Sequence, residues 1–190
     1  MKLTNHHLLS FKKGQSLVEF AILLPLLLIL ALGVVDFSRA IQFNNILVAM
    51  SREGANLAAR SSESHPNIIR ALINTASPLT MSNSGQIYIT RIVGTLINGK
   101  VSPIVQTQTR AVNGGNNLPS KIWTCPNSFS STDGTCTKPS GGWANATATL
   151  LNLTLSDGEE VYAVETLYNY DVIMNYVMQS GPQLYSLTIL

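Results

Sequence analysis

Residues 17–35 read LVEFAILLPLLLILALGVV, a stretch in which Glu19 is the single polar side chain. An α-helix of this length extends for about 28 Å at the standard rise, close to the roughly 30 Å thickness of the hydrocarbon core of a bilayer. A core helix of a soluble domain is seldom apolar on every face for so long, because one face normally meets water. The stretch therefore predicts one membrane-spanning helix.

The charges beside this span predict its orientation. Residues 1–14 carry three lysines and no acidic residue, a net charge of +3, whereas the whole chain carries +2 and the remainder −1. Basic residues next to the N-terminal end of a span favour the cytoplasm for that end. We therefore expect a cytoplasmic leader at 1–14 and a periplasmic or extracellular domain at 62–190. No basic patch with interleaved aromatic residues indicates nucleic-acid binding.

The helical pattern continues beyond the span. Pro25 is the one proline in residues 15–61, and a spanning helix tolerates it. After the span, apolar or small residues recur at spacings of three and four, which places them on one helix face. These residues are Phe43, Leu47, Met50, Gly54 and Leu57. We expect one long helix over 15–61, transmembrane at 17–35 and then amphipathic, with its apolar stripe packed against the rest of the chain.

The first part of the remaining chain predicts a helix and a hairpin. Residues 67–75 form an apolar helical pattern, and a preceding proline fits its first turn. Residues 86–93 alternate and are rich in β-branched side chains, which predicts a strand. Asn98-Gly99 is a strong hairpin signal that leads to a second strand over 101–109.

The last part of the chain predicts loops and further strands. Pro103 demotes part of the second strand to a sheet edge or a bulge. Residues 113–145 are rich in Asn, Gly, Ser, Thr and Pro and predict a loop. An Asp-Gly turn then separates predicted strands over 148–155 and 160–170, and residues 172–178 fit either a strand or a helix. The predicted fold class is α+β, a long N-terminal helix packed on a small antiparallel β-rich domain.

The two cysteines fit a domain outside the cytoplasm. Cys125 and Cys136 enclose the ten residues PNSFSSTDGT. In an oxidising compartment a disulfide would restrain this loop, with a stabilisation of about 3 kcal/mol in the chain-entropy model. Two free thiols are the alternative. A metal site would need further ligands, and His6, His7 and His65 are remote in sequence, so we expect neither a metal nor a cofactor.

The N-terminal edge of the span is unusual. Residues 12–20 read KKGQSLVEF, so a carboxylate lies three residues into an apolar segment. A charge inside a membrane costs about 2–3 kcal/mol on insertion scales and by default indicates a functional site that needs a cationic partner. The alternative is that Glu19 lies among the lipid headgroups and is partly hydrated.

The ordered series of residues at this edge resembles the processing site of type IV prepilins. The series comprises a basic leader, Gly14, a carboxylate at the fifth position of the mature chain, and then Phe20. This version is similar to the TadE-type subfamily of the tight-adherence (Flp) pilus systems. Residues 49–55 read AMSREGA, close to the family's Ala-x-x-Arg-Glu-Gly-Ala pattern. The resemblance covers about residues 12–60, and the C-terminal domain resembles no family that we can name.

The resemblance implies a pilin-like fold and a place in pilus assembly. It implies a minor pilin or pseudopilin of the bacterial inner membrane, since the family's major pilin is far shorter than this chain. A membrane prepilin peptidase would cut between Gly14 and Gln15. Glu19 and Phe20 would be assembly contacts, with Glu19 pairing with the Gln15 ammonium of a neighbouring subunit and so favouring one axial register. The implied partners are the lipid bilayer, the peptidase, other pilin or pseudopilin subunits and the assembly machinery.

Other functions remain open from the sequence alone. No nucleophile with a base, phosphate loop or paired carboxylates is present, so we predict no catalytic residue and no enzyme. Ser38-Arg39-Ala40 resembles a signal-peptidase site, and a cut there would release a secreted domain beginning at Ile41. An uncleaved chain would be a membrane-anchored periplasmic binding module, such as a sensor or adhesin. The N-terminal residue of the mature protein separates these readings.

Overall fold

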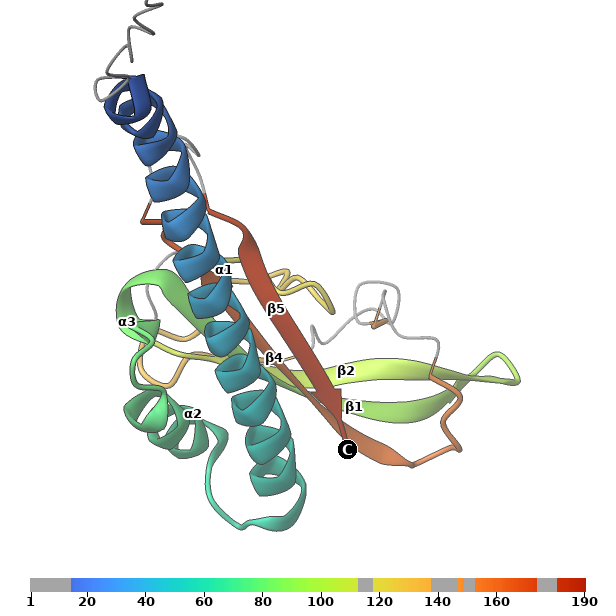
Figure 1. Ribbon diagram of the computed structural model, residues 1–190. Coiled ribbons are helices and arrows are strands. Elements are labelled where there is room, and N and C mark those ends of the chain that lie inside the picture. The colour runs from blue at the N-terminus through green and yellow to red at the C-terminus, as the bar shows by residue number, and fades with distance from the viewer. Residues whose placement is uncertain (1–14, 113–117, 138–146, 149–152, 174–180) are drawn as a thin grey trace, which may run out of the picture.

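The structure is a computed structural model, and it describes residues 15–112, 118–137, 147–148, 153–173 and 181–190. Within these residues one long helix lies across a twisted antiparallel sheet, and its N-terminal half projects away from the domain (Figure 1). This arrangement confirms the predicted α+β fold class. The predicted leader at 1–14, which includes Gly14, lies outside the described residues.

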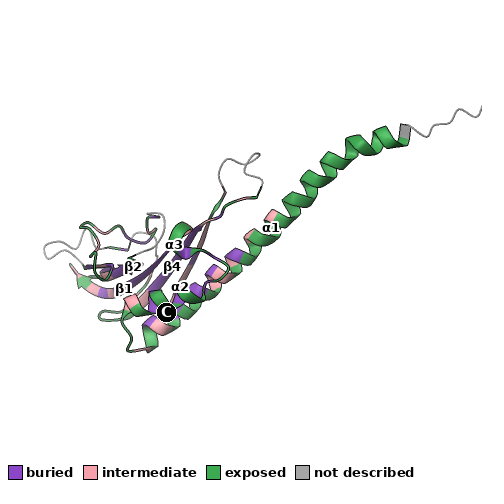
Figure 2. Cartoon of the chain, turned by 90° about the vertical axis from the view of Figure 1, so that its left-hand side faces the viewer, coloured by how far each residue is buried: buried purple, intermediate pink, exposed green. Residues whose placement is uncertain are grey.

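Helix α1, Gln15–Arg60, continues without a break past Pro25. In the described chain it is the one helix long and apolar enough to cross a membrane. Every residue from 16 to 35 is exposed, whereas the second half buries one face against the domain (Figure 2). Phe43, Leu47, Met50 and Gly54 of the predicted stripe are buried and Leu57 is half-buried. The helical periodicity therefore identified the face that meets the domain.

The sheet has five strands among the described residues, in the order β3-β2-β1-β4-β5. All four pairings are antiparallel. The strands are β1 (Gly85–Ile97), β2 (Lys100–Arg110), β3 (Thr135–Thr137), β4 (Glu160–Asn169) and β5 (Gln183–Ile189). Two shorter helices precede them, α2 (His65–Thr75) and α3 (Met81–Ser84).

The hairpin between β1 and β2 forms where the sequence predicts it. Asn98 and Gly99 have φ angles of 50° and 79°, the positive values that a two-residue turn with the twist of the strands requires. The short strand β3 pairs only with residues 107–109 of β2. Pro103 lies beyond that pairing, beside an isolated bridge formed by the next residue. Its place at an edge of the sheet agrees with the prediction.

The C-terminal part of the sheet differs from the prediction. A strand over 148–155 is wrong for residues 148 and 153–155, which are not in a strand, and residues 149–152 lie outside the described part. The apolar side chains of Ala148, Leu153 and Leu155 pack on a core cluster instead of joining a ladder. The strand β5 pairs with β4 from Asn169↔Gln183 to Ala163↔Ile189. Of residues 172–178, which by sequence fit either a strand or a helix, 172 and 173 are in neither, and 174–178 lie outside the described residues.

Two layers cover the two faces of the sheet. On one face, α1 and α2 enclose a core that contains Leu47, Leu72 and Val164. On the other face, the loop of residues 118–137 packs Ile122 and Trp123 against the sheet. Because both faces are covered, β4 is buried along most of its length and does not alternate simply between apolar and polar residues.

Candidate functional site

The N-terminal half of α1 presents an exposed apolar surface. Leu17, Ile22 and Val34 are 71%, 69% and 70% exposed, and Figure 2 shows this half of the helix exposed all round. Soluble monomers rarely expose contiguous apolar patches larger than a few hundred Å². This half of α1 therefore requires an apolar partner, which can be lipid or other protein helices.

The predicted assembly residues lie at the start of this surface. Gln15 is the first residue of α1, and Glu19 follows one turn later with its side chain exposed. Phe20 is 59% exposed beside it. The structure thus places Glu19 and Phe20 on the projecting part of the helix, where a second molecule can reach them. Their role in assembly stays a prediction.

Asp36 ties the end of the apolar stretch to the domain. The Tyr170 hydroxyl donates a hydrogen bond to the Asp36 carboxylate at 3.2 Å, and the Ile173 N–H donates to the same oxygen at 2.9 Å. About two turns further along α1, the Phe43 ring packs edge-to-face with Tyr168 and Tyr170, at centroid distances of 5.7 and 5.4 Å. These contacts fix the orientation of the domain about the helix at the point where the exposed apolar surface ends.

Further along α1, the AMSREGA segment packs directly on the sheet. Ser51 is fully buried, and its hydroxyl lies 2.9 Å from the hydroxyls of both Ser186 and Thr188 on β5. The Thr166 hydroxyl of β4 donates a hydrogen bond to the Leu47 carbonyl at 3.1 Å. These hydroxyls take the place of water as hydrogen-bond partners, so the polar atoms buried between α1 and the sheet remain hydrogen-bonded. The second half of α1 is therefore bonded to both C-terminal strands.

Gly54 permits this close approach. A Cβ atom there would lie 2.9 Å from Leu72 Cδ1 on α2 and 3.1 Å from Val164 Cγ1 on β4. Both distances are shorter than ordinary carbon contacts of about 3.5–4.0 Å. Arg52 and Glu53 of the same segment are exposed. The motif thus combines a packing residue with two charges on the outer face of the helix.

On the opposite face of the sheet, a buried carboxylate holds the loop of residues 118–137. Glu165 accepts hydrogen bonds from the Lys121 N–H at 2.9 Å and the Tyr185 hydroxyl at 3.1 Å, and also from the Ser120 hydroxyl. Burial raises the pKa of Glu165, while these donors act in the opposite direction. Sequence reasoning missed this residue, because nothing in the local pattern marks one glutamate of β4 as buried.

The predicted disulfide is present in this loop. Cys125 and Cys136 are bonded, with their Cα atoms 6.2 Å apart. Cys136 belongs to β3, which pairs with β2. The disulfide therefore attaches the loop to the edge of the sheet, while Glu165 holds it near the centre.

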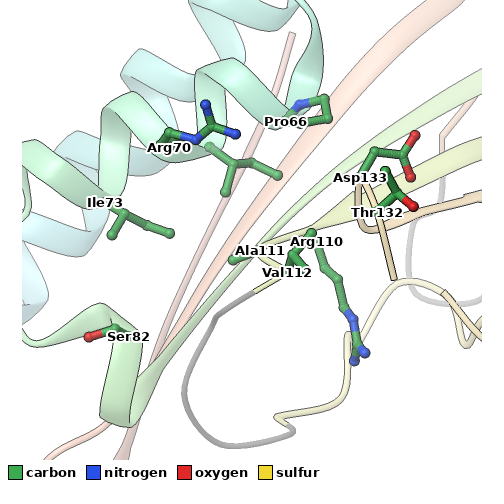
Figure 3. A pocket seen from close by; sticks show the side chains of 10 residues that line it. Pro66, Arg70, Ile73, Ser82, Arg110, Ala111, Val112, Thr132 and Asp133 are labelled. Atoms are coloured by element: carbon green, nitrogen blue, oxygen red, sulfur yellow. The ribbon is translucent and has the colours of Figure 1, made fainter. Parts of the chain in front are cut away.

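A shallow cleft of about 210 Å³ lies between α2 and the end of β2 (Figure 3). Arg70, Arg110 and Asp133 are its charged side chains. Figure 3 shows the Arg110 guanidinium turned away from the other two, and it lies over the Phe129 ring at 4.5 Å. These charges do not converge on one point. Among the residues that the structure describes, no group of three His, Cys, Asp or Glu side chains could hold a metal ion.

The comparisons with known proteins concern the N-terminal helix. Neither the curated proteins nor the solved structures contain a match to the chain. The family model of TadE-like proteins matches residues 14–56, a segment that contains the exposed half of α1, Asp36, Ser51 and Gly54. This match confirms the resemblance predicted from the sequence: over residues 14–56, less than half of its length, the chain is similar to TadE-like proteins.

Proposed function

We propose that the chain is a minor pilin or pseudopilin of a tight-adherence pilus. Residues 17–35 anchor it in the bacterial inner membrane, with the leader 1–14 in the cytoplasm and the domain 62–190 in the periplasm. The observation that carries the proposal is the composition of α1, one continuous helix that is exposed and apolar in its first half and bonded to a folded domain in its second half. Such a helix can exchange lipid for the helices of other subunits without rearranging the domain.

The bonding between α1 and the domain supports this exchange. Asp36, Ser51 and Gly54 contact three different parts of the domain. A domain held at several points keeps one orientation relative to the helix. A subunit built in this way enters a fibre as a rigid unit, and the exposed apolar half of α1 changes its neighbours from lipid to other subunits.

Processing by a prepilin peptidase fits the start of α1. Cleavage between Gly14 and Gln15 would leave an ammonium group at the first residue of the helix. We propose that Glu19 pairs with the Gln15 ammonium of a neighbouring subunit and that Phe20 packs beside this pair. In a bundle of apolar helices an ion pair of good geometry favours one axial register over others, because an unpaired charge there is costly.

The alternative of a secreted domain would require cleavage inside a packed helix. Ala40 lies within α1 and is half-buried, and it follows Asp36, which is bonded to Tyr170 and Ile173. A cut after Ala40 would remove the Asp36 contacts from the domain. The structure of this segment supports an intact helix and therefore the pilin proposal.

The test combines N-terminal sequencing with an assembly assay in cells that carry the complete pilus system. Sequencing of the mature protein should find Gln15, whereas Ile41 would identify a secreted domain and Met1 an uncleaved anchored module. Either of these two results would overturn the proposal.

The assembly contact is tested by Glu19→Ala, with Glu53→Ala as the matched control on the exposed face of the same helix. Both variants should insert into the membrane and be cleaved. Glu19→Ala should be missing from sheared fibres on immunoblots, and Glu53→Ala should be present at the level of the unmodified chain. Normal incorporation of Glu19→Ala would show that Glu19 is no assembly contact.

A further inference from the structure

We propose that the end of the domain nearest the span is seated in the bilayer, where an apolar groove beside α1 holds a phospholipid acyl chain. The proposal rests on the membrane anchoring in the proposed function and adds a lipid-binding surface to it. The groove has a volume of about 650 Å³. Leu30, Gly33 and Phe37 line it from α1, and Tyr170, Val172 and Pro182 line it from the domain.

The position of the groove along α1 identifies its occupant. Its lining begins at Ile29 and Leu30, inside the predicted span, and continues to Ala40, beyond the end of the span. At about 1.5 Å per residue, Leu30 lies roughly 8 Å inside the end of the span at Val35. The groove is therefore continuous with the surface of α1 that faces lipid, and an acyl chain can enter it without leaving the hydrocarbon layer.

Asp36 holds the domain at this level of the helix. The Asp36 carboxylate accepts hydrogen bonds from Tyr170 and from the backbone of Ile173. The Ile173 side chain is 47% exposed and the Phe37 side chain is 69% exposed. Both apolar side chains are thereby fixed within about one helical turn of Val35. Exposed apolar groups at that height are stabilised by burial at the boundary between headgroups and acyl chains.

The chemistry of the surface favours lipid over a water-filled cleft. Asp36 is the one charged residue in the lining of the groove, and its carboxylate is already bonded to Tyr170 and Ile173. The next charged side chain along α1 is Arg39, which is exposed about one turn beyond Val35. A guanidinium at that height suits a lipid phosphate. The apolar lining of the groove thus suits an acyl chain, and the Arg39 guanidinium nearby suits the phosphate of the same phospholipid.

The experiment uses tryptophan substitutions in the full chain, reconstituted in nanodiscs with or without lipids brominated on their acyl chains. Bromine quenches tryptophan fluorescence only at short range. Val172→Trp reports on the groove and Ile173→Trp on the neighbouring surface. Ile22→Trp reports on the span, and Leu96→Trp is the matched control, since Leu96 is also exposed, at 56%, but lies near the tip of the β1–β2 hairpin. The signal of the parent chain is subtracted in each case.

We expect Val172→Trp and Ile173→Trp to be quenched nearly as strongly as Ile22→Trp and several times more strongly than Leu96→Trp. Quenching of Ile22→Trp without quenching of the other variants would overturn the proposal and leave the anchor intact. Quenching at Ile173 without quenching at Val172 would overturn the acyl-chain site. Absence of quenching at Ile22 would overturn the membrane anchor itself. If Val172→Trp does not fold by circular dichroism, Pro182→Trp tests the same groove.

Discussion

Replacement of Gly54 by alanine tests whether the contact between α1 and the domain is as close as the structure places it. The residue lies inside α1, where α2 and β4 approach it from two sides. The added Cβ atom would lie 2.9 Å from Leu72 Cδ1 and 3.1 Å from Val164 Cγ1. Two opposing effects decide the sign of the change in stability.

The first effect favours the variant, because alanine is better than glycine in a helix by about 0.8–1.0 kcal/mol. The second opposes it, because extra atoms in a well-packed core cost about 1–3 kcal/mol. Leu72 and Val164 are 2% and 0% exposed, so neither can turn into solvent, and the β-branched Val164 has little rotamer freedom. We therefore expect Gly54→Ala to lower the free energy of unfolding by about 1 kcal/mol and Gly54→Val to lower it by about 3 kcal/mol.

Thermal unfolding of the full chain in detergent micelles, followed by near-ultraviolet circular dichroism, measures this change. For a domain of this size 1 kcal/mol corresponds to a decrease in Tm of about 3 °C. The matched control is Asn56→Ala on the exposed face of the same helix, which improves helix propensity without new contacts and should raise Tm slightly. If Gly54→Ala also raised Tm, the close contact between α1, α2 and β4 would be refuted.

Three further changes probe the domain. Burial raises the pKa of Glu165 above its ordinary 4.5, so between that value and the raised pKa the native state keeps a proton that the unfolded chain loses. The free energy of unfolding should therefore fall as the pH rises from about 4.5 through the raised pKa. Urea titrations of Glu165→Gln should lack this decrease, and the same pH dependence in both proteins would contradict the burial of an ionisable Glu165. Ser51→Ala should lower the free energy of unfolding by about 1–2 kcal/mol, because the buried Ser186 hydroxyl loses a partner, and an unchanged urea midpoint would show that this bond is dispensable. The double variant Cys125→Ser, Cys136→Ser should lose about 3 kcal/mol of the free energy of unfolding, and reduction of the unmodified chain should lower its unfolding midpoint to the same value; a midpoint that reduction leaves unchanged would indicate free thiols in the native protein.

Much of the fold could be predicted because its signals are local. The buried face of α1 follows from the spacing of Phe43, Leu47 and Met50, and the hairpin follows from Asn98-Gly99. In both cases residues within a few positions of one another determine the outcome. The disulfide was predicted in the same way, from the closeness of two cysteines in a loop-like stretch.

Long-range contacts account for what could not be predicted. Residues 153–155 have the apolar character of a strand, yet they pack on the sheet without joining it. The groove forms only because the segments that contain Tyr170 and Pro182 pack beside α1 in the folded chain. Tyr170 is 134 residues from its hydrogen-bond partner Asp36 in the sequence. The periodicity of one segment does not indicate which distant segment will pack against it.

The sequence by itself determined that residues 17–35 are an apolar helix of membrane-spanning length, that a charged edge precedes them, and that the helix continues with one face prepared for packing. These properties depend on composition and on helical spacing, which act within a few turns. Only the tertiary structure decided which residues hold the helix to the domain. Asp36, Ser51 and Gly54 acquire their roles from partners on distant segments, and Glu165 becomes buried only when the loop of residues 118–137 covers the sheet. Burial and hydrogen bonding depend on which surfaces meet, and that is settled by the whole chain.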